Sequence, residues 1–69
     1  MKTIEDFIKW DCSNYLHELD LVSYEFKDGA LWSRWKFKQH IIDKNGYEGE
    51  DQYFETDHCM GLYNDYFDK

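Results

Sequence analysis

The chain has 69 residues, including three Trp, six Tyr and five Phe, and it carries fifteen Asp or Glu against eight Lys or Arg, for a net charge of −7. A chain this short is expected to form one domain, residues 1–69, and a substrate cleft of about 300 Å³ would remove the centre of its core. The acidic excess disfavours nucleic acid and anionic membranes as partners and favours basic proteins.

Residues 3–19 are predicted to form an amphipathic helix. Thr3 and Asp6 fit a capping box, in which each residue's side chain accepts a hydrogen bond from the other's backbone N–H. The apolar side chains recur at helical spacing and form one stripe, made of Ile4, Phe7, Ile8, Cys12, Tyr15, Leu16 and Leu19. Trp10 lies off this stripe and is expected at its rim.

Asp28-Gly29 predicts a β-hairpin between a strand at 21–27 and a longer strand at 30–42. A two-residue type I′ turn needs positive φ at both central positions, which Asp-Gly supplies. The expected pairs are Phe26 with Leu31, Tyr24 with Ser33, and Val22 with Trp35. These residues and Phe37 are expected on the inner face of the sheet, with Trp32, Arg34, Lys36 and Lys38 on the outer face.

Asn45-Gly46 carries the same turn signal and predicts a second hairpin to a third strand. A two-residue loop there pairs Trp35 with Thr56 and Phe37 with Phe54 on the inner face. On the outer face it pairs Lys36 with Glu55, Arg34 with Asp57, and His40 with Asp51. Opposite charges on neighbouring strands stabilise such a sheet modestly, so the register is self-consistent.

A last helix is predicted at about 58–67, with Asp57 as its cap and Gly61 as a weakening residue. The predicted fold is therefore α+β, with a three-stranded antiparallel β-meander, two helices on one face, and the order α-β-β-β-α.

Four side chains suggest a metal site, namely Cys12, His40, His58 and Cys59. Zinc ligands usually come in pairs with two to five residues between them. Here His58 and Cys59 are adjacent, and Cys12 and His40 are distant in the sequence. We therefore predict no metal and no cofactor, and we expect both cysteines to be packed thiols. Cys12 is on the buried stripe and Cys59 has acidic neighbours, so neither fits a reactive thiolate, and the protein is predicted not to be an enzyme.

The acidic third-strand region is the predicted partner-binding surface. Its residues, with two aromatic anchors, are Glu48, Glu50, Asp51, Tyr53, Glu55, Asp57 and Trp32. Spaced carboxylates on a small scaffold can occupy a basic site that normally holds phosphates. The composition, with no Pro and single Ala and Arg residues, suggests an AT-rich gene. Such genes are common in phages and mobile elements and also in many AT-rich bacteria.

These observations predict a small acidic interaction module that inhibits a basic, nucleic-acid-processing protein by charge mimicry. One alternative is a single-stranded nucleic-acid binder that uses the outer sheet face, where Trp32, Arg34 and Lys36 combine stacking and positive charge. Another is a homodimer that packs on the same face, so the chain is expected as a monomer or homodimer. The acids could also serve only solubility.

The first apolar residues are interleaved with charges, which does not fit a secretory signal peptide, and no stretch approaches the roughly 18 apolar residues of a membrane span. We therefore expect a cytoplasmic protein, in the host cytoplasm if it is encoded by a phage.

Overall fold

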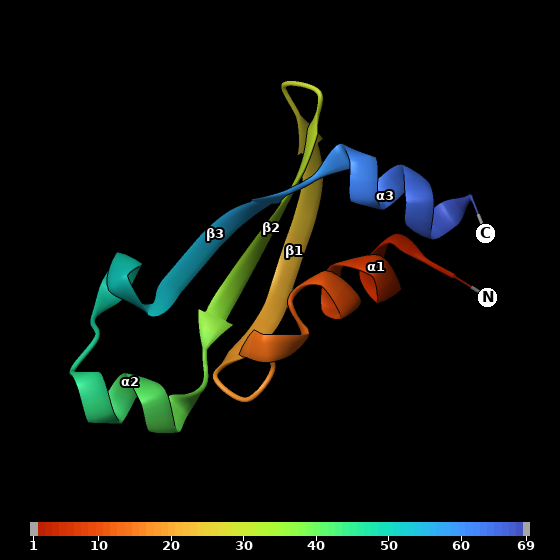
Figure 1. Cartoon of the computed structure of the whole chain (residues 1–69). Coiled ribbons are helices and arrows are strands. Elements are labelled where there is room, and N and C mark those ends of the chain that lie inside the picture. The colour runs from red at the N-terminus through yellow and green to blue at the C-terminus, as the bar shows by residue number, and fades with distance from the viewer. Residues whose placement is uncertain (1, 69) are drawn as a thin grey trace.

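The computed structural model describes residues 2–68 (Figure 1). Its elements in order are α1 (Ile4–Asp11), the 3₁₀ turn η1 (Ser13–Tyr15), β1 (Leu19–Lys27), β2 (Ala30–Phe37), α2 (Gln39–Asn45), the 3₁₀ turn η2 (Gly49–Gln52), β3 (Tyr53–His58) and α3 (Met60–Phe67). The strands form one antiparallel sheet in the order β1-β2-β3. Figure 1 shows α1 and α3 near each other, with α2 at the opposite end of the sheet. The α+β class and the meander are confirmed, whereas the order α-β-β-α-β-α and the additional helix correct the prediction.

Helix α1 begins as predicted and ends early. The Asp6 N–H donates to Thr3 Oγ1 and the Thr3 N–H donates to Asp6 Oδ2, each at 3.1 Å, which confirms the capping box. The helix stops at Asp11 instead of continuing to 19. Residues 11–14 (Asp-Cys-Ser-Asn) are weak helix formers, and the short polar side chains compete for backbone hydrogen bonds.

The first hairpin is confirmed. Asp28 has φ 53° and Gly29 has φ 77°, as a type I′ turn requires. The predicted pairs Phe26–Leu31 and Tyr24–Ser33 are present, but a bulge between Leu21 and Ser23 places Leu21 opposite Trp35. The predicted pairing of Val22 with Trp35 is therefore wrong, because the bulge leaves Val22 unpaired and exposed.

The prediction of a second hairpin is wrong. β2 ends at Phe37 instead of reaching Ile42, and Asn45-Gly46 ends helix α2, where Gly46 adopts φ 69° and its N–H donates to the Ile42 carbonyl. A helix C-cap and a type I′ turn both favour residues that tolerate positive φ, so one dipeptide suits either structure. His40 consequently lies in α2 and does not pair with Asp51.

The third strand is displaced by two residues from the predicted register. The observed pairs include Trp35 with Phe54, Arg34 with Glu55, Trp32 with Asp57, and Lys36 with Tyr53. A displacement of two residues keeps every side chain on its predicted face, because the side-chain period of a strand is two. Asp57 belongs to β3 and does not cap the last helix, whose N-cap is Cys59.

The core lies between the sheet and helix α1, with α3 packed beside it. Its buried residues are Phe7, Ile8, Cys12, Leu19, Leu31 and Trp35, and Met60, Tyr63, Tyr66 and Phe67 of α3 are partly buried against them. Tyr24 and Phe26, expected inside, are about half exposed. They lie on an edge strand, where a neighbouring strand shields only one side.

Substitution by alanine should change the free energy of unfolding in opposite directions at Gly61 and at Gly29. In α3 a Cβ on Gly61 would meet only Cys59 Sγ, at an ordinary 3.6 Å, so Gly61→Ala is expected to raise the free energy of unfolding by about 0.5–1 kcal/mol. Gly29→Ala is expected to lower it by about 1 kcal/mol, because φ is positive there. Urea unfolding followed by Trp fluorescence measures both, and a destabilised Gly61→Ala variant would contradict the helical conformation at this position.

Candidate functional site

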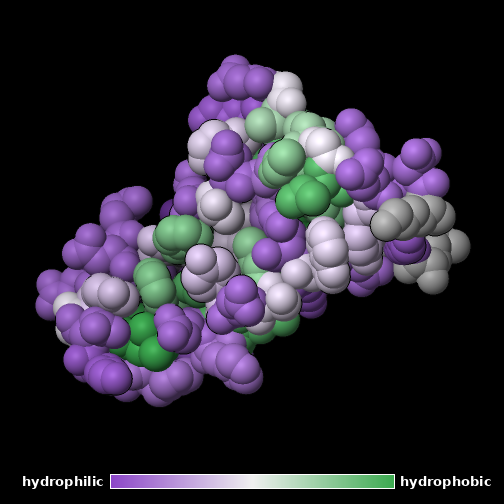
Figure 2. Space-filling model, viewed as in Figure 1, coloured by the Kyte–Doolittle hydropathy of each residue, from purple (hydrophilic) through white to green (hydrophobic). Residues whose placement is uncertain are grey.

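The acidic edge consists of Glu48, Glu50, Asp51, Glu55 and Asp57. All five residues are exposed, three of them in or just before η2 and two on β3. β3 is an edge strand, because it pairs only with β2. Figure 2 shows mostly hydrophilic residues over the end of the molecule that holds α2 and η2. The acidic edge therefore faces solvent along one side of the sheet.

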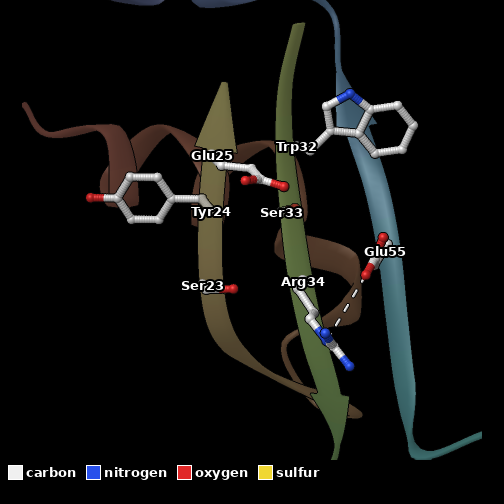
Figure 3. A pocket seen from close by; sticks show the side chains of 7 residues that line it. All are labelled: Ser23, Tyr24, Glu25, Trp32, Ser33, Arg34 and Glu55. Atoms are coloured by element: carbon white, nitrogen blue, oxygen red, sulfur yellow. Dashed lines mark ion pairs between the residues drawn. The ribbon is translucent and has the colours of Figure 1, made fainter. Parts of the chain in front are cut away.

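The outer face of the sheet lies beside this edge and is opposite to the face that carries α1 and α3. Figure 3 shows Trp32, Arg34 and Glu55 on this side, around a shallow hollow of about 250 Å³ that Ser23, Tyr24, Glu25 and Ser33 also line. Trp32 is directly opposite Asp57 across the strands. The structure thus brings Trp32, Tyr53, Glu55 and Asp57 together, while Glu48, Glu50 and Asp51 lie beyond the start of β3.

Arg34 on β2 and Lys38, just after the end of β2, lie next to acids, and Arg34 also lies over an aromatic ring. The Arg34 guanidinium lies over the Tyr53 ring, 4.4 Å from its centroid, and Arg34 Nε is 3.9 Å from Glu55 Oε1. Lys38 Nζ is 3.5 Å from Asp20 Oδ1. The predicted pairs of Arg34 with Asp57 and Lys36 with Glu55 are therefore wrong, because β3 is displaced by two residues. Exposed ion pairs of this kind stabilise little, so Glu55 can still engage a partner.

A second constellation lies inside the protein, on the inner face of the sheet. His58 Nδ1 is 2.7 Å from Asp11 Oδ2, and His58 Nε2 is 2.8 Å from Ser33 Oγ. Trp35 Nε1 donates to the same Ser33 Oγ at 2.9 Å. An ionised carboxylate only accepts, so His58 donates from Nδ1 to Asp11. In the tautomer whose only ring N–H is at Nδ1, Nε2 accepts a hydrogen bond from the Ser33 hydroxyl. The buried side-chain nitrogen and oxygen atoms of Ser33, Trp35 and His58 then all have partners.

These contacts have the order and spacing of a Ser-His-Asp triad. Ser33 and His58 are only 1% and 3% exposed, however, and the Ser33 hydroxyl already accepts the Trp35 indole N–H. A nucleophile must reach its substrate, so we interpret the constellation as a buried network that organises the core. The sequence signal for it is Ser33 itself, a polar residue between Leu31 and Trp35 on the inner face, which needs a buried partner.

The two cysteines are free thiols in different environments. Cys12 is buried and Cys59 is exposed, so the prediction of two packed thiols is wrong for Cys59. Burial raises the pKa of the Cys12 thiol, and the negative charge of Asp11 raises it further. Of the four ligands considered from the sequence, the structure brings together Cys12 and His58, with Asp11 as an unforeseen third member. His40 and Cys59 are not part of this group.

Comparisons with protein-family models, with curated proteins and with solved structures find no match. None of the helices in residues 2–68 has the length and apolar character needed to cross a membrane. The function is therefore inferred from the protein's own surface and its buried polar groups.

Proposed function

We propose that the protein is a non-enzymatic interaction module that binds a basic surface of another protein through its acidic edge. The observation that supports this is the exposure of five carboxylates, two on the edge strand β3 and three in or just before the turn η2 that leads into it. Lys44 is the single Lys or Arg between positions 43 and 68. Clustered charge of one sign raises the association rate with an oppositely charged partner and excludes partners of like charge.

Two aromatic residues beside the acids give this surface an apolar component. Tyr53 is partly buried under the Arg34 guanidinium, and Trp32 is partly buried opposite Asp57. Aromatic side chains at the centre of an interface commonly contribute most of the binding energy, while charges at the rim set association rate and specificity. Trp32 and Tyr53 are the proposed anchors.

The partner that fits best is a nucleic-acid-processing protein, whose basic groove holds phosphates. Glu55 and Asp57 point to one face about 6.6 Å apart along the strand, which holds two negative charges at a fixed spacing on a rigid support. A module of this kind would act as an antagonist by charge mimicry. The composition of the chain supports a phage or mobile-element source, and such an antagonist would act in the host cytoplasm.

The experiment is affinity capture of proteins from a bacterial lysate on the immobilised full chain, followed by titration of the captured protein. Binding is expected to weaken steeply with salt, and a nucleic-acid duplex should compete for the captured protein. The variant E48Q/E50Q/D51N/E55Q is expected to lower the affinity by roughly 100-fold, because each lost charge contact contributes up to about 1 kcal/mol.

The matched control is E5Q/E18Q/D65N/D68N, which removes the same number of exposed charges away from the acidic edge. It should bind nearly as well as the natural chain. Equal loss in both variants would assign the effect to net charge alone, and salt-independent capture would contradict the proposal.

Two further measurements separate the alternatives. Quenching of Trp fluorescence by a single-stranded oligonucleotide, lost in Trp32→Ala, would indicate nucleic-acid binding on the outer face instead. A dimer mass in light scattering that disappears in Trp32→Glu would indicate self-association through that face.

A further inference from the structure

Three potential metal ligands meet where the end of α1 approaches the end of β3. Atoms of Asp11, Cys12 and His58 that could ligate a cation all lie within 4.8 Å of one another. In a tetrahedral zinc site, metal–ligand bonds of about 2.0–2.3 Å place the ligand atoms roughly 3.3–3.8 Å apart. Small side-chain shifts therefore suffice to bring the three atoms around one ion.

The Asp11–His58 hydrogen bond alone does not account for this group. That bond explains why a carboxylate and an imidazole are adjacent, and the Cys12 thiol, which is buried at the edge of the core, adds a third potential ligand beside both. A thiol, an imidazole and a carboxylate at one point are ligands that Zn²⁺ accepts together, whereas Mg²⁺ and Ca²⁺ prefer oxygen atoms only.

The surroundings also suit a cation. His58 Nε2 is 2.8 Å from Ser33 Oγ, and the ring packs edge-on against Phe7. A ligating histidine usually donates a hydrogen bond from its other nitrogen, which orients the ring. With Nδ1 bound to a metal, the ring N–H would be at Nε2, and Ser33 Oγ is placed to accept it. Cys12 is the C-cap of α1, so the partial negative charge of the helix C-terminus lies next to the group.

We propose that Asp11, Cys12 and His58 bind one Zn²⁺ ion, with Asp11 on the solvent side. The Asp11 side chain is 25% exposed, whereas the His58 side chain is fully buried. An ion can therefore enter past Asp11, and a water molecule can complete four ligands there. The ion would join α1 to β3 across 47 residues of sequence. It would stabilise the fold independently of the acidic edge, which contributes none of these ligands.

The test is titration of the full, reduced and chelator-treated chain with Co²⁺ as a spectroscopic probe, followed by displacement with Zn²⁺. One equivalent of Co²⁺ is expected to give the d–d bands of a tetrahedral site and a thiolate-to-cobalt charge-transfer band. At a Zn²⁺ concentration about a hundred times Kd, the Tm should rise by roughly 10 °C or more, whereas Mg²⁺ at the same concentration should leave it unchanged.

Variants distinguish this site from other binding. Cys12→Ser should abolish the charge-transfer band, and Asp11→Asn should weaken binding at least about tenfold. Cys59→Ser is the matched control, because it removes the exposed thiol and should retain the band. If Cys12→Ser does not fold by circular dichroism, Asp11→Asn at the partly exposed position still decides the question.

Three outcomes would overturn the proposal. The first is the absence of a thiolate band in the natural chain. The second is loss of the band in Cys59→Ser but not in Cys12→Ser. The third is a Zn²⁺-dependent rise in Tm that is unchanged in both Asp11→Asn and Cys12→Ser, which would show binding to surface carboxylates.

Discussion

Replacing Ser33 with alanine is expected to lower the free energy of unfolding by roughly 2–5 kcal/mol, far more than a serine usually contributes. The hydroxyl accepts the Trp35 indole N–H and lies 2.8 Å from His58 Nε2, and both serine and histidine are buried. Its removal leaves a buried donor and a buried acceptor without partners, and each such group costs about 1–3 kcal/mol. Urea unfolding followed by Trp fluorescence and by far-UV circular dichroism measures the loss.

Ser23→Ala is the matched control for this prediction. Ser23 lies on the neighbouring strand and is exposed, so its removal should change stability by no more than about 0.5 kcal/mol. A double-mutant cycle tests the mechanism. Trp35→Phe removes the donor that Ser33→Ala leaves unpaired, so it should cost less in the Ser33→Ala background than in the natural chain. If the stability losses of Ser33→Ala and Trp35→Phe simply add in the double variant, the two residues are not coupled, and this would contradict the buried network.

Local signals predicted the first hairpin and the faces of the sheet. Asp28-Gly29 specifies a turn by its own backbone preferences, and the alternation from Ala30 to Phe37 then assigns the side chains to two faces. The bulge at Val22 was not predictable, because it serves to bring Leu19 and Leu21 toward a core that only the assembled fold defines.

Helix α2 was missed because one dipeptide fits two structures. Asn45-Gly46 is typical of a type I′ turn, but Gly46 has the same positive φ when it ends a helix. The informative signal lies earlier. The alternation fails after Phe37, where Lys38, Gln39 and His40 are all polar. A strand cannot continue a two-residue period through that run, whereas a short helix can turn one apolar face inward with Ile42.

The acidic edge was identifiable from composition, but the buried network was not. Exposed acids need no partner within the protein, so their position in the sequence already indicates a charged surface. The network joins His58 to Ser33 and Asp11, which are 25 and 47 residues away. Such contacts depend on how α1 packs on the sheet and how β3 pairs with β2, and no local preference encodes that arrangement.

The second large effect is expected at Phe7, the residue that joins the two helices to the sheet. Phe7 is fully buried, and its ring lies 5.3–5.7 Å from the rings of Tyr63, Tyr66 and His58. Phe7→Ala is expected to lower the free energy of unfolding by about 3–5 kcal/mol. A domain of this size has roughly 3–10 kcal/mol in total, so this variant should lose a large part of its stability and unfold at a much lower urea concentration.

Phe54→Ala provides the comparison, because it makes the same substitution on β3 at a ring that is 39% exposed. Its cost should be less than half that of Phe7→Ala. Equal losses would mean that the aromatic residues contribute alike wherever they lie, and Phe7 would not be the centre of the core.

The milder variant Phe7→Leu tests how α3 is held to the protein. α3 packs on Phe7 through Tyr63, Tyr66 and Phe67, whereas the hairpin of β1 and β2 is joined by its own backbone hydrogen bonds. Hydrogen exchange should therefore lose protection first in α3 and remain slow in β2. Uniform loss of protection would instead show that helix and sheet unfold as one unit. In that case Phe7 supports the acidic edge on β3 as directly as it supports α3.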